Sequence, residues 1–285
     1  MITRFVYYLI IIPLSLLPHK VLYFISDIIY IFMYRLFRYR RNVVFKNLQN
    51  SFPTKSNDDL KIIMRKFYHH LCDLIVESLK GFTISEVELK KRLTVKNPEL
   101  CSVFSDNSQS VILVGAHYNN WEFVAQSLSL YSNHKCIGIY KPLSNTFLNN
   151  KIFYSRSKYG MGLVSMQESK KSFIDDGIAK AVIFGSDQNP SNPEKAYWLN
   201  FLNQDTGVLF GAEKYSKDYN WPVVYISISK KSRGFYEVEY TLVADKPNDQ
   251  PHGKITEDFT KLIENDIINL PQYWLWSHKR WKHKR

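Results

Sequence analysis

The chain has 285 residues, of which 45% are hydrophobic and 15% aromatic, and its formal net charge is +12. A chain of this length can bury one large core or two smaller ones. With 11 glycines and 11 prolines it lacks the composition of a disordered or low-complexity protein. Its three cysteines stand far apart, which argues against a disulfide framework or a zinc cluster and is typical of a reducing compartment.

Two apolar runs open the chain, at residues 5–17 and 21–34, and Pro18-His19-Lys20 separates them. Neither run alone reaches the ~20 residues that a membrane-spanning helix needs. We predict that residues 1–40 form an apolar helical membrane anchor. It is either a kinked helix or helical hairpin lying partly in the bilayer, or one tilted span that uses both runs. The alternative is a pair of buried amphipathic helices in a soluble domain.

Ten of the positive charges lie in two short segments that contain no acid, residues 35–46 and 273–285. Aromatic residues accompany both segments, so each fits an anionic surface, either a membrane or a nucleic acid. The first segment directly follows the apolar runs. The positive-inside rule therefore places it, and the body of the protein, on the cytoplasmic side.

The remainder, residues 41–285, is predicted to form a single α/β domain. A long helix at 57–80 begins after Ser56 and carries His69, His70 and Asp73, which lack a third metal ligand and are better explained as a polar helix face. Strands and helices then alternate, which predicts a mostly parallel central sheet wrapped by helices, with ligands at the carboxyl ends of the strands. The predicted strands are 111–116, 135–140, 180–185, 222–229 and 234–243, and the predicted helices are 120–131, 145–158, 168–177, 207–218 and 254–269.

The clearest chemistry lies at His117, which follows the first of these strands, and at Glu122, five residues later. A neutral histidine is a natural general base for a hydroxyl, and a carboxylate can fix its tautomer and stabilise the charge it acquires. Positions five apart on one helix do not face each other. We therefore expect His117 in the strand–helix turn and Glu122 in the first helical turn. The alternative is that His117 only satisfies a turn and Glu122 only caps a helix.

VGAHYNNWEF, residues 114–123, resembles the first motif of the bacterial lipid A biosynthesis acyltransferases, the lauroyl/myristoyl transferases within the lysophospholipid acyltransferase superfamily. The family often has Asp at the position of Glu122. Other segments resemble the family in the same order along the chain, namely 140–145, 155–160, 185–189 and 273–282.

The resemblance implies acyl transfer from a thioester, usually on acyl carrier protein, to a hydroxyl of a lipid A precursor at the bacterial inner membrane. His117 would deprotonate the hydroxyl and Glu122 would orient His117, with no acyl-enzyme. Arg156 would hold an anionic headgroup, since a guanidinium suits phosphate geometry. Asn120, Asp187 and Gln188 are further candidates for substrate binding, although a helix start or a structural turn would also explain them. No metal or cofactor is implied, and acyl-ACP or acyl-CoA would be the co-substrate.

Two alternative functions belong to other classes of acceptor or partner. The first is an acyltransferase of the same superfamily that acts on a lysophospholipid or an aminolipid. The second is a basic protein that binds nucleic acid or another anionic surface through Trp274, Trp276 and Trp281 and the lysines beside them. The apolar N-terminus favours a lipid partner, so we expect no nucleic acid.

Overall fold

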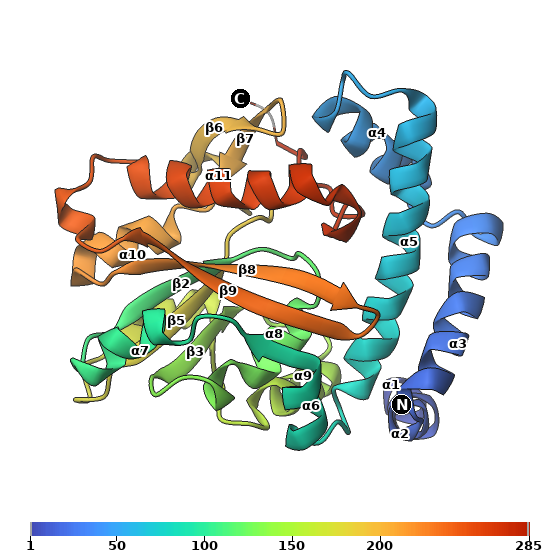
Figure 1. Cartoon of the computed structure of the whole chain (residues 1–285), viewed down its shortest axis with the longest axis horizontal. Coiled ribbons are helices and arrows are strands. Elements are labelled where there is room, and N and C mark those ends of the chain that lie inside the picture. Colours follow the sequence, from blue (N-terminus) through green and yellow to red (C-terminus); the bar gives the residue numbers. More distant parts are fainter. Residues whose placement is uncertain (1, 284) are drawn as a thin grey trace.

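A seven-stranded sheet forms the centre of the computed structural model, which describes residues 2–283 and 285 (Figure 1). Its strand order is β1-β9-β8-β2-β5-β3-β4, and all neighbouring strands are parallel except β8 and β9, which form a hairpin. The predicted α/β fold with a mostly parallel sheet is confirmed. The strands are β1 Leu93–Val95, β2 Val111–Gly115, β3 Lys135–Tyr140, β4 Gly162–Ser165, β5 Lys180–Gly185, β8 Val223–Ser232 and β9 Phe235–Ala244, and a separate hairpin pairs β6 Tyr197–Phe201 with β7 Gln204–Val208.

Helices cover both faces of the sheet. They are α1 Ile2–Val6, α2 Ile12–Leu16, α3 His19–Tyr30, α4 Arg41–Ser51, α5 Asn57–Lys80, α6 Glu86–Arg92, α7 Glu99–Asp106, α8 Trp121–Ser127, α9 Thr146–Ser157, α10 Gly211–Tyr219 and α11 Lys254–Asn269. The helix predicted at 57–80 is confirmed as α5, and the hydroxyl of Ser56 caps it by accepting from the amide of Asp59. The helix predicted at 168–177 is a 3₁₀ segment instead, Met166–Phe173.

Alternate residues of the buried strands supply two separate hydrophobic cores. On β2, Ile112 and Val114 belong to the core that includes residues of α5 and α11, whereas Val111 and Leu113 belong to the core under α7 and α8. This follows from the pleat, because successive side chains of a strand point to opposite faces. All four side chains are buried, so β2 and its neighbours are held rigidly from both sides.

The two N-terminal apolar runs form separate helical stretches. The backbone is extended at Leu17 and Pro18, so α1–α2 and α3 are not one helix; Figure 1 shows α1 and α2 end-on and α3 lengthwise. Pro18 favours this break because proline restricts the residue before it to extended conformations. Within residues 2–283, no helix is both long and apolar enough to cross a membrane. The structure therefore gives no support to one span that uses both runs, and the membrane anchor at residues 1–40 stays a prediction.

Polar contacts attach α3 to the body of the protein. Tyr23 donates to Glu77 of α5 at 2.8 Å, and Ser26 donates to Asp73 at the same distance. Arg233, in the turn between β8 and β9, bonds to the carboxylates of both Asp73 and Asp27. The apolar face of α3 does not contribute to these contacts, and much of it remains exposed, as described below.

Candidate active site

The register of β2 and β5 places two candidate site residues side by side. Gly115 and Gly185 end these parallel strands as Cα partners, and the amide of Ser186 donates to the carbonyl of Gly115 at 2.9 Å. His117 and Asp187 each lie two residues beyond these glycines. Both therefore leave the sheet at the same carboxyl edge, where sites of parallel α/β folds form.

His117 and Asp187 make a doubly bonded pair. The Nδ1 atom of His117 lies 2.7 Å from Oδ1 of Asp187, and the backbone amide of His117 donates to Oδ2 at 3.0 Å. An ionised carboxylate only accepts, so Nδ1 carries the proton and Nε2 keeps its lone pair for a substrate proton. The imidazole side chain is 26% exposed, whereas Asp187 is buried. The Nε2 atom of His117 is thus free of the Asp187 contact, and the ring is partly accessible, as a general base would require.

The pairing corrects the expected partner of His117. Glu122 was predicted to orient the imidazole, and Asp187 was predicted to bind substrate. In the structure Asp187 holds the imidazole, with its carboxylate buried beneath that ring. Glu122 is nearer to His117 in sequence, but Asp187 is nearer in space. The reason is the pairing of β2 with β5, which the sequence separation does not reveal.

Glu122 forms an ion pair with Arg156. It lies in the first turn of α8, and its Oε1 accepts from Nη2 of Arg156 at 2.5 Å while Oε2 accepts from Nε at 3.0 Å. The indole of Trp121 also donates to Oε1, and its ring stands edge-on to His117 with centroids 5.2 Å apart. Arg156 projects from the last turn of α9 with two guanidinium nitrogens turned toward Glu122. The pair therefore borders the imidazole without bonding to it in the part of the chain that the structure describes.

Asn120 has a structural role, which corrects its prediction as a substrate ligand. Its side-chain oxygen caps α8 by accepting from the amide of Phe123 at 2.8 Å, and its nitrogen donates to Glu77 at 2.6 Å. The side chain is buried, so both polar atoms are used inside the protein. Asn119, before it, adopts a left-handed backbone with φ of 50°, a conformation that asparagine tolerates better than most residues.

The C-terminal segment closes the site from the other side. Trp274 donates from its indole to Oδ2 of Asp187 at 2.8 Å, and the carbonyl of Tyr273 accepts from the amide of Asn119 at 3.0 Å. Trp274 and Trp276 are 2% and 0% exposed. The expectation that these tryptophans lie at a lipid or nucleic-acid surface is therefore wrong, since they belong to the core beneath the site.

Two site residues were missed by sequence reasoning. Trp274 is one; its position in a tail that resembles the family in type and order was the only available signal. His278 is the other: its Nε2 accepts from the amide of Asn189 at 3.3 Å, and it senses the charges of both Asp187 and His117. Burial is the main reason that the pKa of His278 lies below its usual value. Gln188 is half-buried beside Asp187, and its substrate role stays a prediction.

Charge interactions set the protonation of the site. Burial lowers the pKa of His117, but the charge and hydrogen bond of Asp187, aided by Glu122, outweigh it and raise the pKa above its usual value. Burial raises the pKa of Asp187, yet His117 and Trp274 hold it below the normal range. The pKa of Glu122 is likewise lowered, because Arg156 outweighs the effect of burial. Both carboxylates are ionised at neutral pH.

A histidine held by a buried carboxylate at the carboxyl edge of a mostly parallel sheet places the chain in the class of α/β proteins whose sites lie at the ends of the strands. The particular family follows from comparison with known proteins. The chain belongs to the bacterial lipid A biosynthesis acyltransferases, whose family model matches residues 1–283. The resemblance seen in the motifs is confirmed.

Two curated relatives are similar to the chain along most of its length. One is the lipid A biosynthesis palmitoleoyltransferase of Escherichia coli strain K12, and the other is the lipid A biosynthesis acyltransferase of Shigella flexneri. Each is 19% identical over 268 residues, which are 93% of this chain and 86% of the relative. Family membership identifies the chain as an acyltransferase of lipid A biosynthesis.

Proposed function

We propose that this protein transfers a fatty acyl chain from the thioester of acyl carrier protein to a hydroxyl of a lipid A precursor. The observation that carries the proposal is the His117–Asp187 pair, in which Nδ1 is bonded to a buried carboxylate and Nε2 is left to take a proton. Family membership supplies the reaction class, and the pair supplies the base that such a reaction needs.

The reaction balances without a covalent enzyme intermediate. Nε2 of His117 accepts the proton of the lipid hydroxyl while the hydroxyl oxygen attacks the thioester carbonyl carbon. The tetrahedral intermediate then collapses, the C–S bond breaks and the new ester remains on the lipid. The departing thiolate takes the proton back from the imidazolium. Asp187 stabilises the positive imidazole between these two proton transfers.

Glu122 and Arg156 contribute to the acceptor site in this proposal. Glu122 fixes the guanidinium through Nε and Nη2, which leaves Nη1 to bond an anionic headgroup. A guanidinium that is already oriented loses less entropy when it binds a phosphate. Arg156 lies on α9 and Glu122 on α8, so the headgroup would be placed beside the imidazole. The catalytic effect of Glu122 is then positional.

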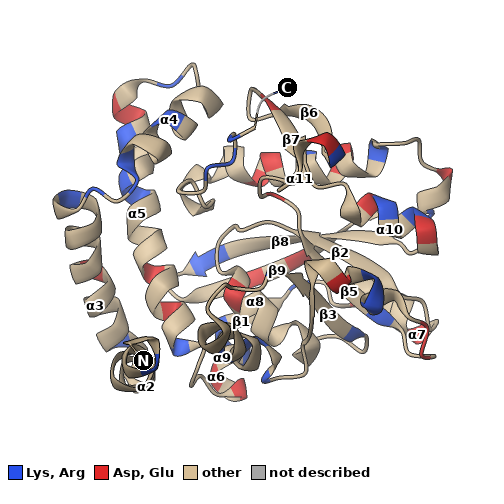
Figure 2. Cartoon of the chain, turned by 180° about the vertical axis from the view of Figure 1, so that it is seen from behind, with Lys and Arg blue, Asp and Glu red and all other residues tan. Residues whose placement is uncertain are grey.

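The N-terminal helices would hold the protein against the inner membrane, with the active site at its cytoplasmic face. Among the residues that the structure describes, 14 of the 28 exposed large apolar side chains lie within residues 2–39, and they include Phe5, Leu9, Phe24 and Ile31. Figure 2 shows α2 and α3 almost without charged residues, and basic residues in the segment between α3 and α4. An exposed apolar patch of this kind marks a surface that meets lipid or another protein. Helices that lie in the membrane plane need not span it.

The decisive experiment measures acyl transfer by the purified protein. Acyl-ACP and a lipid A precursor are incubated with the unmodified chain, His117→Ala and the control His252→Ala, which replaces an exposed histidine. We expect the rate to fall about 10²–10⁴-fold for His117→Ala and to stay unchanged for the control. Near-normal turnover by His117→Ala would reject the role of the imidazole.

The same assay tests the alternative acceptors. A lysophospholipid and an aminolipid replace the lipid A precursor, and acyl-CoA replaces acyl-ACP. Preference for one of these substrates would move the protein to another branch of the superfamily and leave the mechanism intact. Burial of Trp274 and Trp276 leaves only Trp281 and the basic residues of the tail to support the nucleic-acid alternative.

A further inference from the structure

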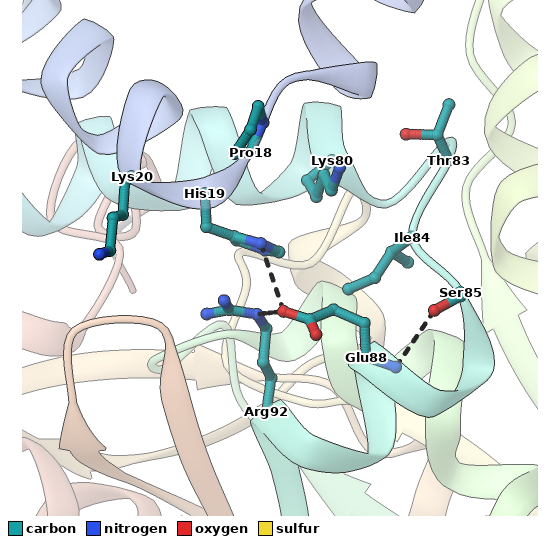
Figure 3. Close-up of a pocket in the computed structure, with 9 residues that line it drawn as sticks. All are labelled: Pro18, His19, Lys20, Lys80, Thr83, Ile84, Ser85, Glu88 and Arg92. Atoms are coloured by element: carbon teal, nitrogen blue, oxygen red, sulfur yellow. Dashed lines mark hydrogen bonds and ion pairs between the residues drawn. The ribbon is translucent and has the colours of Figure 1, made fainter.

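A cavity of about 510 Å³ lies where the second N-terminal helix begins, apart from the active site. Its walls come from residues 18–20 at the start of α3, from the end of α5 and from α6, and they include neither His117 nor its contacts. Figure 3 shows the side chains of His19 and Arg92 both reaching the same oxygen of the Glu88 carboxylate. The acyl-transfer chemistry uses none of these groups.

The cavity carries an excess of positive charge. Lys20, Lys80 and Arg92 line it with a single acid, Glu88. Arg92 already forms an ion pair with Glu88, since the Nε of Arg92 donates to Oε1 of Glu88 at 2.7 Å. Lys80 donates to the carbonyl of Leu17, and among the described residues no carboxylate pairs with Lys80 or Lys20. Lys80 and the exposed Lys20 are therefore left without a paired carboxylate at the cavity.

His19 supplies a second, independent sign of a missing ligand. Its side chain is 9% exposed, and within residues 2–283 its Nε2 atom has no hydrogen-bond partner. Nδ1 faces Glu88 at 3.5 Å, so an acceptor at Nε2 would complete the imidazolium. Burial lowers the pKa of His19 to about 4, and the charges of Arg92 and Lys80 add to this effect. An anion in the cavity would act against the effects of burial, Arg92 and Lys80, and would raise the pKa of His19.

The backbone adds to the attraction for an anion. Helix α3 has twelve residues and starts at His19, and its N-cap residue, Pro18, provides no side-chain hydrogen bond. The first amides of a helix and its dipole favour negative charge. Leu16 of α2 and Val21 and Phe24 of α3, close in sequence to the lining residues 18–20, are exposed apolar side chains. A ligand that combines an anionic group with hydrocarbon fits this arrangement.

We propose that the cavity formed by His19, Lys20, Lys80 and Arg92 binds the phosphate group of a membrane lipid. The inference rests on the proposal that α1–α3 meet the bilayer. A phosphodiester held here would fix the depth and orientation of the N-terminal helices, since the phosphate would occupy the cavity while the acyl chains continue along the exposed apolar residues. The chemistry recognised is that of a phosphate, which a free phosphate ion shares.

Vesicle flotation of the full-length chain tests the lipid. Binding is compared on phosphatidylcholine vesicles with and without phosphatidylglycerol, for the unmodified chain, Lys20→Gln and the double variant with Lys80→Gln. A matched control removes two lysines elsewhere, Lys55→Gln with Lys195→Gln. We expect the double variant to lose about tenfold in affinity for anionic vesicles, Lys20→Gln to lose part of this, and the control to lose less than twofold. Equal losses in the control and the double variant would overturn the site, because they indicate a diffuse charge effect.

Histidine NMR of the protein in detergent separates a lipid from a free ion. The His19 signals are assigned with His19→Gln, and inorganic phosphate or a short-chain phosphatidylglycerol is added. We expect the lipid to shift these signals and raise the pKa of His19, with inorganic phosphate acting only at much higher concentration. Equal response to inorganic phosphate without a phosphatidylglycerol effect in flotation would overturn the lipid assignment, and no response to either would overturn the site.

The His117→Ala variant keeps this test distinct from that of the proposed function. It should float with anionic vesicles as the unmodified chain does, although it transfers no acyl group. If His117→Ala stayed active, the proposed mechanism would fail while the vesicle result for Lys20 and Lys80 would stand. If no form of the protein bound vesicles, the membrane contact would fail together with the lipid site, and the transfer assay would be unaffected.

Discussion

Trp274 and His117 donate to the same oxygen of Asp187. The indole Nε1 lies 2.8 Å and the backbone amide of His117 lies 3.0 Å from Oδ2, while the imidazole takes Oδ1. Three donors thus stabilise the charged form of a buried carboxylate, which holds its pKa down against the effect of burial. Trp274 lies 87 residues after Asp187 in sequence, so this hydrogen bond couples the C-terminal tail to the charge of the carboxylate that holds His117.

Replacing Trp274 by phenylalanine should weaken the base without emptying the core. The ring remains, but Oδ2 of Asp187 loses one donor, so the pKa of Asp187 rises and the carboxylate is held less firmly in place against the imidazole. A hydrogen bond to a charged group is worth about 1.5–3 kcal/mol, and we expect a tenfold slower transfer rate and a loss of stability of that order. Urea unfolding and the transfer assay measure the two effects.

Trp276→Phe is the matched control for this prediction. Its indole donates to the carbonyl of Pro271 at 2.5 Å and its ring packs edge-on against Trp274. The control should lose stability and keep its transfer rate per folded molecule. If both variants lost activity equally, Trp274 would act through packing alone.

The pH profile of Asp187→Asn reports the charge that Asp187 supplies. Transfer needs neutral His117, so activity falls as the pH drops through the pKa of that imidazole, which lies above its usual 6.5. The amide removes the two effects of Asp187 that raise this pKa, and the acid limb should move to lower pH. We expect kcat to fall roughly 10²–10⁴-fold as well, because the tautomer is no longer fixed. An unchanged acid limb would contradict the pairing.

Glu122→Gln distinguishes a positional role from an orienting one. In the unmodified chain, Glu122 holds Arg156 by two charge-assisted hydrogen bonds. The glutamine amide keeps the shape of Glu122 but cannot balance the charge of Arg156. If Glu122 positions Arg156 for a headgroup, KM for the acceptor should rise about tenfold, more than kcat falls. A drop in kcat alone, with KM preserved, would return Glu122 to the orienting role that the sequence suggested. Both kinetic constants come from one titration of acceptor.

Gly185 leaves room for the imidazole. A Cβ on this residue would lie 3.3 Å from Cε1 of His117, closer than most such contacts, so the ring would shift by a few tenths of an ångström. We expect Gly185→Ala to slow transfer about tenfold while the fold persists. Gly115→Ala is the control, since its Cβ would meet Ile226 at an ordinary 3.8 Å and it is the strand partner of Gly185. Equal rates for the two variants would refute the steric argument.

Local patterns predicted the regular elements well. The helix predicted at 254–269 and the strands predicted at 135–140 and 180–185 have the bounds observed, because each depends on hydrophobic periodicity within its own residues. The short β6–β7 hairpin was missed, since polar residues such as Gln204 and Asp205 give it no strand pattern. The 168–177 segment is too short for its local propensity to hold an α-helix.

The site needed information that no local pattern contains. His117 and Asp187 were both singled out, but their pairing depends on β5 lying next to β2, and the chain order places β3 and β4 between them. Likewise, alternating tryptophan and lysine in the tail indicated a surface, whereas Trp274 and Trp276 enter the core beside α5 and α11. Both errors arise from tertiary contacts between segments that are distant in sequence.

The turn between β8 and β9 should depend on the absence of a side chain at Gly234. This residue has a φ of 79°, and a Cβ there would collide with the hydroxyl of Tyr23 and with Nη1 of Arg92. Gly177 has a similar φ of 73°, but a Cβ on it would have nothing within 4 Å. Because of the left-handed backbone, alanine at either position should lower the free energy of unfolding by about 1–2 kcal/mol. In Gly234→Ala the collision should lower the free energy of unfolding by about 1–3 kcal/mol more.

Urea unfolding of the two alanine variants therefore measures how tightly α3 is docked. Tyr23 donates to Glu77 from the same hydroxyl that the new methyl group would displace, so Gly234→Ala should also free α3 from α5. Proteolysis between α3 and α4 should then be faster in Gly234→Ala than in Gly177→Ala. Equal free energies of unfolding and equal cleavage rates would contradict this prediction. They would mean that the turn accommodates the methyl group without displacing Tyr23, or that the contact between Asp73 and Arg233 is enough to hold α3 in place.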